Sequence, residues 1–335
     1  MVFFFFSSFV FLFCFLFCSV QSVLHFPPAT ITPSQPTKTP KNAGHLAQGH
    51  RPATYRSISS IPKTHLLTCD YRGFGLSSLT QPPNIPTETG LITDAISLLT
   101  YIRTTLQHPP ARTLLLGQSL GTAVSSAAAL YFAAPTSPYL PSDLPAPQDT
   151  TSPFASIILV APFRDLPTLL QTYAIAGVLP ILKPLRGYPR IANYLATKIV
   201  DQWDTQARLI ALISETSNAG SVLHVHILHA RNDADITFRE SEALYQPLQS
   251  ALLGEEGVSA TEERRSIHGG ERVKRGAFAY KKVEDSKGKR VVELEVVRFG
   301  GHNEVVGWNQ VGLAVRRGLL RGEGVRRGKV GLDVE

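Results

Sequence analysis

Cysteine, methionine and tryptophan are scarce in this chain of 335 residues, which contains three, one and two of them, respectively. Cys14 and Cys18 lie in an apolar N-terminal segment, and Cys69 lies in an apolar run that is typical of a buried strand. Three cysteines placed in this way provide neither a disulfide framework nor the spacing of a cysteine-based metal site. The sequence therefore excludes a fold held together by disulfide bonds or by cysteine-bound metal.

Lysine and arginine are absent from the N-terminal region up to Lys38. Residues 3–20 are apolar apart from three serines, and a segment of this length can cross a bilayer. It lacks the basic n-region and the clear cleavage site of a secretory signal. We interpret residues 1–24 as an anchor, a signal or an artefact of gene assembly, followed by a Pro- and Thr-rich linker over residues 25–41. If the segment is an anchor, the basic residues after it favour a cytosolic body.

Aromatic residues interleaved with basic ones, as nucleic-acid sites require, are also missing. The net charge of +7 arises largely in the C-terminal part, where basic residues gather between residues 264–290 and 316–329. We expect no nucleic-acid partner and interpret these residues as a solvated surface. Attraction to anionic lipid headgroups is the alternative.

The most informative motif is Gly-x-Ser-x-Gly, formed by Gly117, Ser119 and Gly121. An apolar run precedes it and a run of small residues follows it, which predicts a strand, a sharp turn and a helix. Because the helix must lie close to the strand, neither glycine position has room for a Cβ. Ser119 would stand at the apex of the turn, at a helix N-terminus that favours developing negative charge. We predict that Ser119 is a catalytic nucleophile.

A nucleophilic serine needs a base, and the base needs an orienting carboxylate. Two runs downstream of Ser119, residues 222–228 and 291–299, have the alternation and β-branched residues of strands. The first run leads to Asp233 and the second to His302. The order serine, acid, histidine is the chain order of α/β-hydrolases. We therefore predict that Asp233 is the acid and His302 is the base.

Each of these two residues also has a plainer explanation. Taken alone, Asp233 is typical of a turn or a helix cap, and His302 is typical of a surface loop. Three suitable residues in the expected order, each after a predicted strand, favour the triad. Asp235 is the alternative acid, although it lies two residues further from the strand end.

Several short sequence motifs resemble those of a known protein family more specifically. Residues 70–77 resemble the D-Y-R-G-x-G-x-S segment of α/β-hydrolases. Residues 117–121, 160–163 and 229–233 are similar to one branch of that superfamily, the membrane-bound, fungal-type relatives of the monoacylglycerol and lysophosphatidylserine lipases. The similarity covers roughly residues 42–315. It implies an α/β fold with a mostly parallel sheet and helices on both faces, and a serine hydrolase that cleaves carboxylic esters of lipids.

The same resemblance points to a missing motif. The family carries H-G-x-A-G after a buried strand, and the loop after His-Gly supplies the second oxyanion amide. Residues 40–44 lack both the histidine and the glycine that follows it, and three prolines prevent residues 30–40 from forming a central strand. We therefore expect an N-terminally truncated fold. Leu120 would supply the first oxyanion amide, and Asn42 or Ala43 an impaired second one.

The remaining chain divides by composition. Residues 42–320 are predicted to form one catalytic domain, followed by a basic tail over residues 321–335. An apolar stretch within residues 163–210 lies where this fold inserts a lid, with ordinary packing of a helix against the sheet as the alternative. Residues 254–289 are polar and charged, and they are predicted to be a mobile insertion.

The predicted chemistry uses a serine, a histidine and an aspartate, so we expect no metal and no cofactor. The expected partner is a small lipid or ester substrate of the monoacylglycerol or lysophospholipid type. The family resemblance instead allows a location on the lumenal face of the endoplasmic reticulum membrane, anchored through residues 3–20; if that segment is an artefact, the protein would be cytoplasmic. Two alternatives stay open: a hydrolase-like protein impaired by its broken oxyanion loop, and a thioesterase or peptidase on the same fold.

Overall fold

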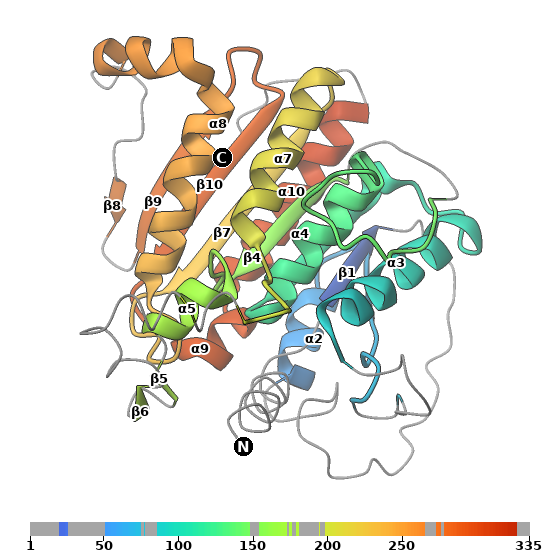
Figure 1. Ribbon diagram of the computed structural model, residues 1–335. Coiled ribbons are helices and arrows are strands. Elements are labelled where there is room, and N and C mark those ends of the chain that lie inside the picture. The colour runs from blue at the N-terminus through green and yellow to red at the C-terminus, as the bar shows by residue number, and fades with distance from the viewer. Residues whose placement is uncertain are drawn as a thin grey trace.

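The computed structural model describes most of the chain between residues 51 and 326, together with a short segment near the N-terminus (Figure 1). The described ranges are 20–25, 51–74, 77, 86–147, 154–172, 174–175, 179–180, 194, 198–264, 273–275 and 278–326. Residues 3–19 of the apolar segment, residues 40–44, much of the predicted lid and the last nine residues lie outside them.

An eight-stranded sheet forms the centre of the molecule, with the strand order β2-β1-β3-β4-β7-β10-β9-β8. The strands are β1 (Val20–His25), β2 (Thr64–Thr68), β3 (Thr113–Gln118), β4 (Ser156–Val160), β7 (Leu223–Ala230), β8 (Val273–Arg275), β9 (Phe278–Glu284) and β10 (Arg290–Val297). The neighbours β3, β4, β7 and β10 run parallel. Every residue of β3, β4 and β7 is buried, because apolar parallel strands are covered on both faces.

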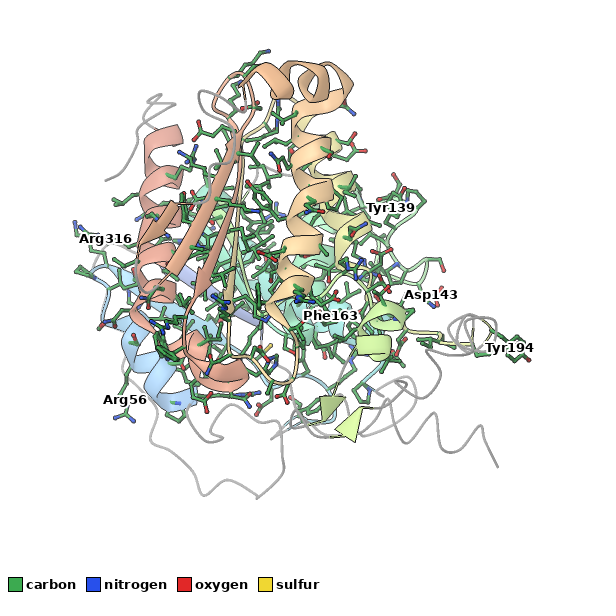
Figure 2. All side chains as sticks on the ribbon, turned by 90° about the vertical axis from the view of Figure 1, so that its left-hand side faces the viewer. Arg56, Tyr139, Asp143, Phe163, Tyr194 and Arg316 are labelled. Atoms are coloured by element: carbon green, nitrogen blue, oxygen red, sulfur yellow. The ribbon has the colours of Figure 1, made fainter. Side chains whose placement is uncertain are left out.

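Helices cover both faces of the sheet, with α8 on one side and α10 on the other in the turned view (Figure 2). The first face carries α3 (Glu88–Thr104), α4 (Leu120–Ala133), α7 (Thr205–Asn218) and α8 (Phe238–Arg264), and the second carries α2 (Arg51–Ser59) and α10 (Asn309–Arg326). A separate cluster of buried apolar side chains fills each interface. This arrangement confirms the predicted α/β fold, with a mostly parallel sheet and helices on both faces.

The truncated fold expected from the sequence, with its first strands missing, is contradicted by a strand ahead of residue 42. β1 lies between β2 and β3 and pairs antiparallel with both. Its residues come from the end of the predicted apolar segment 1–24 and the first position of the predicted linker. Residues 20–25 continue an apolar run, so local pattern alone did not separate a strand from a membrane segment, and both pairing partners are distant in the sequence.

Two predicted boundaries in the C-terminal part are also wrong. The supposed insertion 254–289 contains β9, which pairs along its whole length with β10, and β8, which pairs with β9. β8 is the outermost strand of the sheet, and such an edge accepts charged residues, which explains why its residues did not look like a strand. The helix α10 continues to Arg326 and therefore extends past the predicted domain end at residue 320 into the supposed tail.

Part of the predicted lid 163–210 is described. It contains α5 (Leu166–Thr172) and a small hairpin formed by β5 (Ala174–Ile175) and β6 (Leu179–Pro180). Leu166, Leu169 and Leu170 of α5 are buried in the core cluster on the α4 side of the sheet. In this described part, the apolar residues pack as an ordinary helix does, and a covering role stays a prediction.

Several basic residues of the C-terminal part form ion pairs. Arg317 contacts Glu295 at 3.1 Å, and Arg290 contacts Asp285 at 2.6 Å. Arg316, by contrast, is exposed and points away from the body of the molecule (Figure 2). The positive charge is therefore divided between paired and solvated side chains. Among the described residues, no helix combines the length and apolar character needed to span a bilayer.

Candidate active site

The strand, turn and helix predicted around Ser119 are present. β3 ends at Gln118, Ser119 follows, and α4 begins at Leu120. Ser119 has φ 52° and ψ −121°, a conformation that non-glycine residues rarely adopt. Its backbone N–H donates to the carbonyl of Val160 on the neighbouring strand at 2.9 Å, and its own carbonyl accepts from the Thr122 N–H at 2.9 Å. The sheet and the helix together hold the strained turn in place.

The two glycines of the motif lie against each other. A Cβ on Gly117 would stand 2.3 Å from the Gly121 carbonyl oxygen and 2.8 Å from the Ser125 hydroxyl oxygen. This close approach lets α4 start directly beside the end of β3. Ser119 itself is 2% exposed. The geometry therefore provides the physical reason for the spacing of Gly117, Ser119 and Gly121.

Replacing Gly117 with alanine should disturb this turn. Overpacking of this kind typically costs about 1–3 kcal/mol, and a shift of about 1 Å at a reacting group can cost about 10²-fold in rate. Gly312→Ala is the matched control, because no atom beyond the adjoining backbone of its own helix lies within 4 Å of a Cβ at that position. The free energy of unfolding, measured in urea, and the rate of ester hydrolysis should both fall in Gly117→Ala and stay unchanged in Gly312→Ala. Equal effects in both variants would contradict this packing role.

The predicted acid and base meet at the end of two parallel strands. β7 and β10 are neighbours, so the loops that follow them leave the same edge of the sheet. Asp233 follows β7, and His302 belongs to the short helix α9 (Gly301–Glu304) that follows β10. The His302 Nδ1 atom lies 2.6 Å from Asp233 Oδ2. Both residues are buried, with 6% exposure for Asp233 and 4% for His302.

The surroundings of Asp233 favour an ionised carboxylate. Its Oδ1 accepts the backbone N–H groups of Asp235 and Ile236, both at 2.9 Å. The His229 Nε2 atom lies 3.3 Å from Oδ2. Burial alone would raise the pKa of Asp233, but the hydrogen bonds from His229 and His302 outweigh burial and hold the pKa well below its usual range. The carboxylate beside His302 thus belongs to Asp233, and Asp235 serves it through a backbone amide.

Residues that sequence reasoning did not single out connect the three loops. The Gln118 side-chain amide donates to the His302 carbonyl at 2.9 Å, which places the base loop against the residue before Ser119. The Asn232 side-chain oxygen accepts from the Gly301 N–H at 3.1 Å and joins the acid loop to the base loop. The motif phrases contained Gln118, Asn232 and His229, but only the fold assigned contacts to them.

The predicted oxyanion donors have different outcomes. Leu120 is the first residue of α4, where backbone N–H groups have no partner within the helix. Asn42 and Ala43 lie outside the described residues. β1 pairs Val20 with Gly117 and Leu24 with Thr113, so it starts near the turn of Ser119 and runs away from it. Its C-terminal end is therefore at the opposite edge of the sheet from the candidate site.

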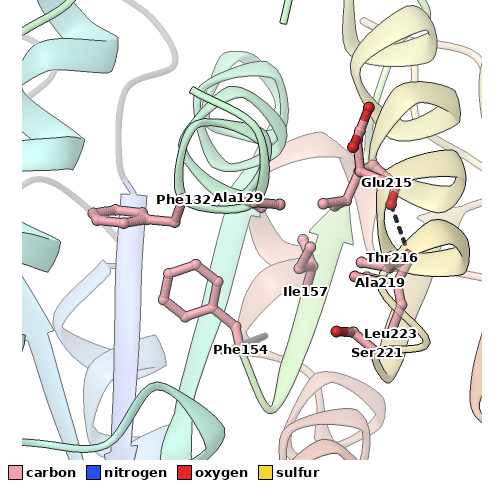
Figure 3. Close-up of a pocket in the computed structure, with 11 residues that line it drawn as sticks. Ala129, Phe132, Phe154, Ile157, Glu215, Thr216, Ala219, Ser221 and Leu223 are labelled. Carbon is pink, nitrogen blue, oxygen red and sulfur yellow. Dashed lines mark hydrogen bonds between the residues drawn. The ribbon is translucent and has the colours of Figure 1, made fainter. Parts of the chain in front are cut away.

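A small apolar pocket lies elsewhere in the molecule (Figure 3). It is lined by α4, α7 and the residues that start β4 and β7, among them Phe132, Phe154, Leu212 and Leu223. These strand starts are at the opposite edge of the sheet from Ser119, Asp233 and His302. We do not assign this pocket to the candidate active site.

Comparisons with known proteins give distant similarities. No protein-family model matches the chain. A protein of Salmonella typhi described as uncharacterized protein YfhR is 38% identical over 79 residues, which are 23% of this chain and 25% of that protein. The same figures apply to its counterpart in Salmonella typhimurium. The chain thus spans about a quarter of the length of the curated relatives it matches.

Solved structures with similar folds are hydrolases by description. An alpha-beta hydrolase from Vibrio vulnificus has a TM-score of 0.46 and 16% identity, over 84% of this chain and 71% of that one. An esterase from Exiguobacterium antarcticum has a TM-score of 0.35 and 11% identity, over 81% of this chain and 86% of that one. These values describe distant similarity, and neither an activity nor a substrate follows from them.

Proposed function

We propose that this protein is a serine hydrolase that cleaves carboxylic esters through an acyl-enzyme. The observation that carries the proposal is the buried Asp233–His302 pair beside the strained turn of Ser119. Nucleophile, base and orienting acid each come from a different loop at one edge of the sheet. Such a set of groups performs acyl transfer on several unrelated folds.

The proposed mechanism follows from which ring nitrogen of His302 is engaged. Because Nδ1 contacts Asp233, the proton of the Ser119 hydroxyl goes to Nε2 as the Ser119 oxygen attacks the ester carbonyl. Asp233 stabilises the imidazolium, and His302 then protonates the leaving alcohol. A water molecule, deprotonated by His302, then attacks the acyl-enzyme carbonyl, and Ser119 leaves with its proton restored as the carboxylic acid product is released. The Leu120 N–H, at the start of α4, is the first donor to the oxyanion.

The second oxyanion donor remains a prediction for Asn42 or Ala43. Removal of one donor from such a site typically costs about 10²–10³ in turnover. The alternative that this chain is an impaired hydrolase therefore depends on those residues. An impaired enzyme would still carry the nucleophile and the proton relay, so covalent labelling of Ser119 and turnover can be separated by experiment.

For the substrate, we propose a lipid ester of the monoacylglycerol or lysophospholipid type. The support is the resemblance of the motif phrases and the apolar stretch that includes α5 and follows β4, at the strand edge that holds Ser119. A membrane location through residues 3–20 belongs to the same proposal. The fold also carries thioesterases and peptidases, which use the same three groups.

A substrate panel tests this proposal. The purified full chain should hydrolyse long-chain monoacylglycerol or lysophospholipid with a higher kcat/KM than a short soluble ester, an acyl thioester or a peptide. Ser119→Ala provides the blank for each substrate. A preference for the thioester or the peptide would replace the lipid proposal. Fluorophosphonate labelling without turnover of any substrate would instead identify the impaired hydrolase.

A further inference from the structure

A second cluster of ionisable side chains lies in the sheet, away from the candidate active site. His224 and His226 alternate on β7, and Glu293 and Glu295 alternate on β10. The parallel register places His226 opposite Glu293. All four residues are buried. They lie on the sheet face covered by α10, because Arg317 of that helix contacts Glu295.

Three donor atoms of this cluster converge. The His224 Nε2 atom lies 3.1 Å from one oxygen of Glu293, and the His226 Nδ1 atom lies 2.9 Å from the other. The three side chains can present ligand atoms that all lie within 4.8 Å of one another. Around a tetrahedral ion with bonds of about 2.0–2.1 Å, donor atoms stand about 3.3 Å apart. The two nitrogen–oxygen distances are thus close to those of a coordination shell.

The outer nitrogen of each histidine faces an oxygen atom. The His224 Nδ1 atom is hydrogen-bonded to the Ser156 hydroxyl at 2.8 Å, whereas the His226 Nε2 atom lies 3.5 Å from a Glu295 oxygen without a hydrogen bond to it. Glu295 is held in turn by Arg317. Metal-binding histidines usually have such a partner on the ring nitrogen that does not bind the metal, which orients the ring and sets its tautomer. This arrangement leaves His224 Nε2 and His226 Nδ1 directed at Glu293.

The charge of the cluster also suits a cation. Glu293 and Glu295 bring two buried carboxylates, and Arg317 pairs with Glu295 rather than with Glu293. Lys282 is opposite Glu293 on β9, but its ammonium group pairs with Glu284. These two cations are therefore engaged by other carboxylates, and a metal ion would bring positive charge to the buried carboxylate of Glu293.

We propose that His224 Nε2, His226 Nδ1 and the Glu293 carboxylate bind one Zn²⁺ ion or a similar divalent transition-metal ion. Water or another donor would complete the tetrahedral shell. His226 lies four positions before the last residue of β7, which is about 13 Å along a strand. The ion would thus lie well away from Asp233, which follows the end of that strand. The ion would therefore be structural: it would fasten β7 to β10, the two strands that position Asp233 and His302.

Metal content and thermal stability test this site in the full chain. The protein is stripped with a chelator and titrated with Zn²⁺, and bound metal is measured by mass spectrometry after gel filtration. We expect one ion per chain, a higher Tm with Zn²⁺ than without it, and visible absorption from tetrahedral Co²⁺. His224→Gln and Glu293→Gln should each weaken the binding by at least about tenfold to a hundredfold.

His108→Gln provides the matched control, because His108 is also buried but lies outside the cluster, with its Nε2 atom 3.2 Å from the Arg112 carbonyl oxygen. This variant should bind Zn²⁺ as the parent does. Two results would overturn the proposal: a stripped chain that takes up no metal and keeps its Tm in the presence of Zn²⁺, or equal Zn²⁺ binding by His224→Gln and the parent. The first result would indicate a cluster held by a proton on one histidine.

Discussion

Replacing Ser119 with alanine should abolish both ester hydrolysis and labelling by a fluorophosphonate probe. The expected loss in kcat is on the order of 10⁶, as when the nucleophile of a serine hydrolase is removed. Gln118, the residue before Ser119, donates to the His302 carbonyl and so holds the loop of the predicted base against this turn. Labelling is measured by in-gel fluorescence and turnover by release of fatty acid.

Ser126→Ala is the matched control for this prediction. Ser126 is a buried serine of the same helix, and its hydroxyl donates to the Thr122 carbonyl within α4. This variant should keep its labelling and most of its turnover. Persistent labelling of Ser119→Ala would show that another residue is the nucleophile, and the proposed function would then need a different site.

Replacing Asp233 with asparagine should lower kcat by about 10⁴, with little change in overall structure. An asparagine amide would favour the wrong tautomer of His302, because Asp233 now accepts from Nδ1 at 2.6 Å. Asp235→Asn should cost much less, since Asp235 contributes its backbone N–H to Asp233. Steady-state kinetics on the same ester give both values. A larger loss in Asp235→Asn would move the acid to that residue.

The same variant has an expected pH signature in stability. The folded pKa of Asp233 lies below its ordinary value of 3.8, so its ionised form favours the folded state. This contribution is present above about pH 4 and is lost as the pH falls from there toward the folded pKa. The unfolding free energy of the parent should therefore fall more steeply below pH 4 than that of Asp233→Asn. Parallel urea titrations between pH 7 and pH 3 measure the difference.

Local pattern was sufficient for the elements that carry the candidate site. The apolar run before Ser119 and the small residues after it predicted β3 and α4, and the structure has them. The runs before Asp233 and His302 likewise predicted β7 and β10. These predictions succeeded because strand periodicity and the close packing of a turn depend on neighbouring residues in the chain. Gly117 shows the second effect directly, since its missing side chain makes room for Gly121.

The tertiary structure decided which of these elements are neighbours. Asp233 and His302 are separated by 69 positions, and only the parallel pairing of β7 with β10 brings them into contact. β1 was missed because its apolar residues fit a membrane segment as well as a strand until β2 and β3 pair with it. The cluster of His224, His226 and Glu293 has the same origin. Alternation puts both histidines on one face of a strand, but the third group comes from another strand, and no local pattern specifies which strand becomes the neighbour.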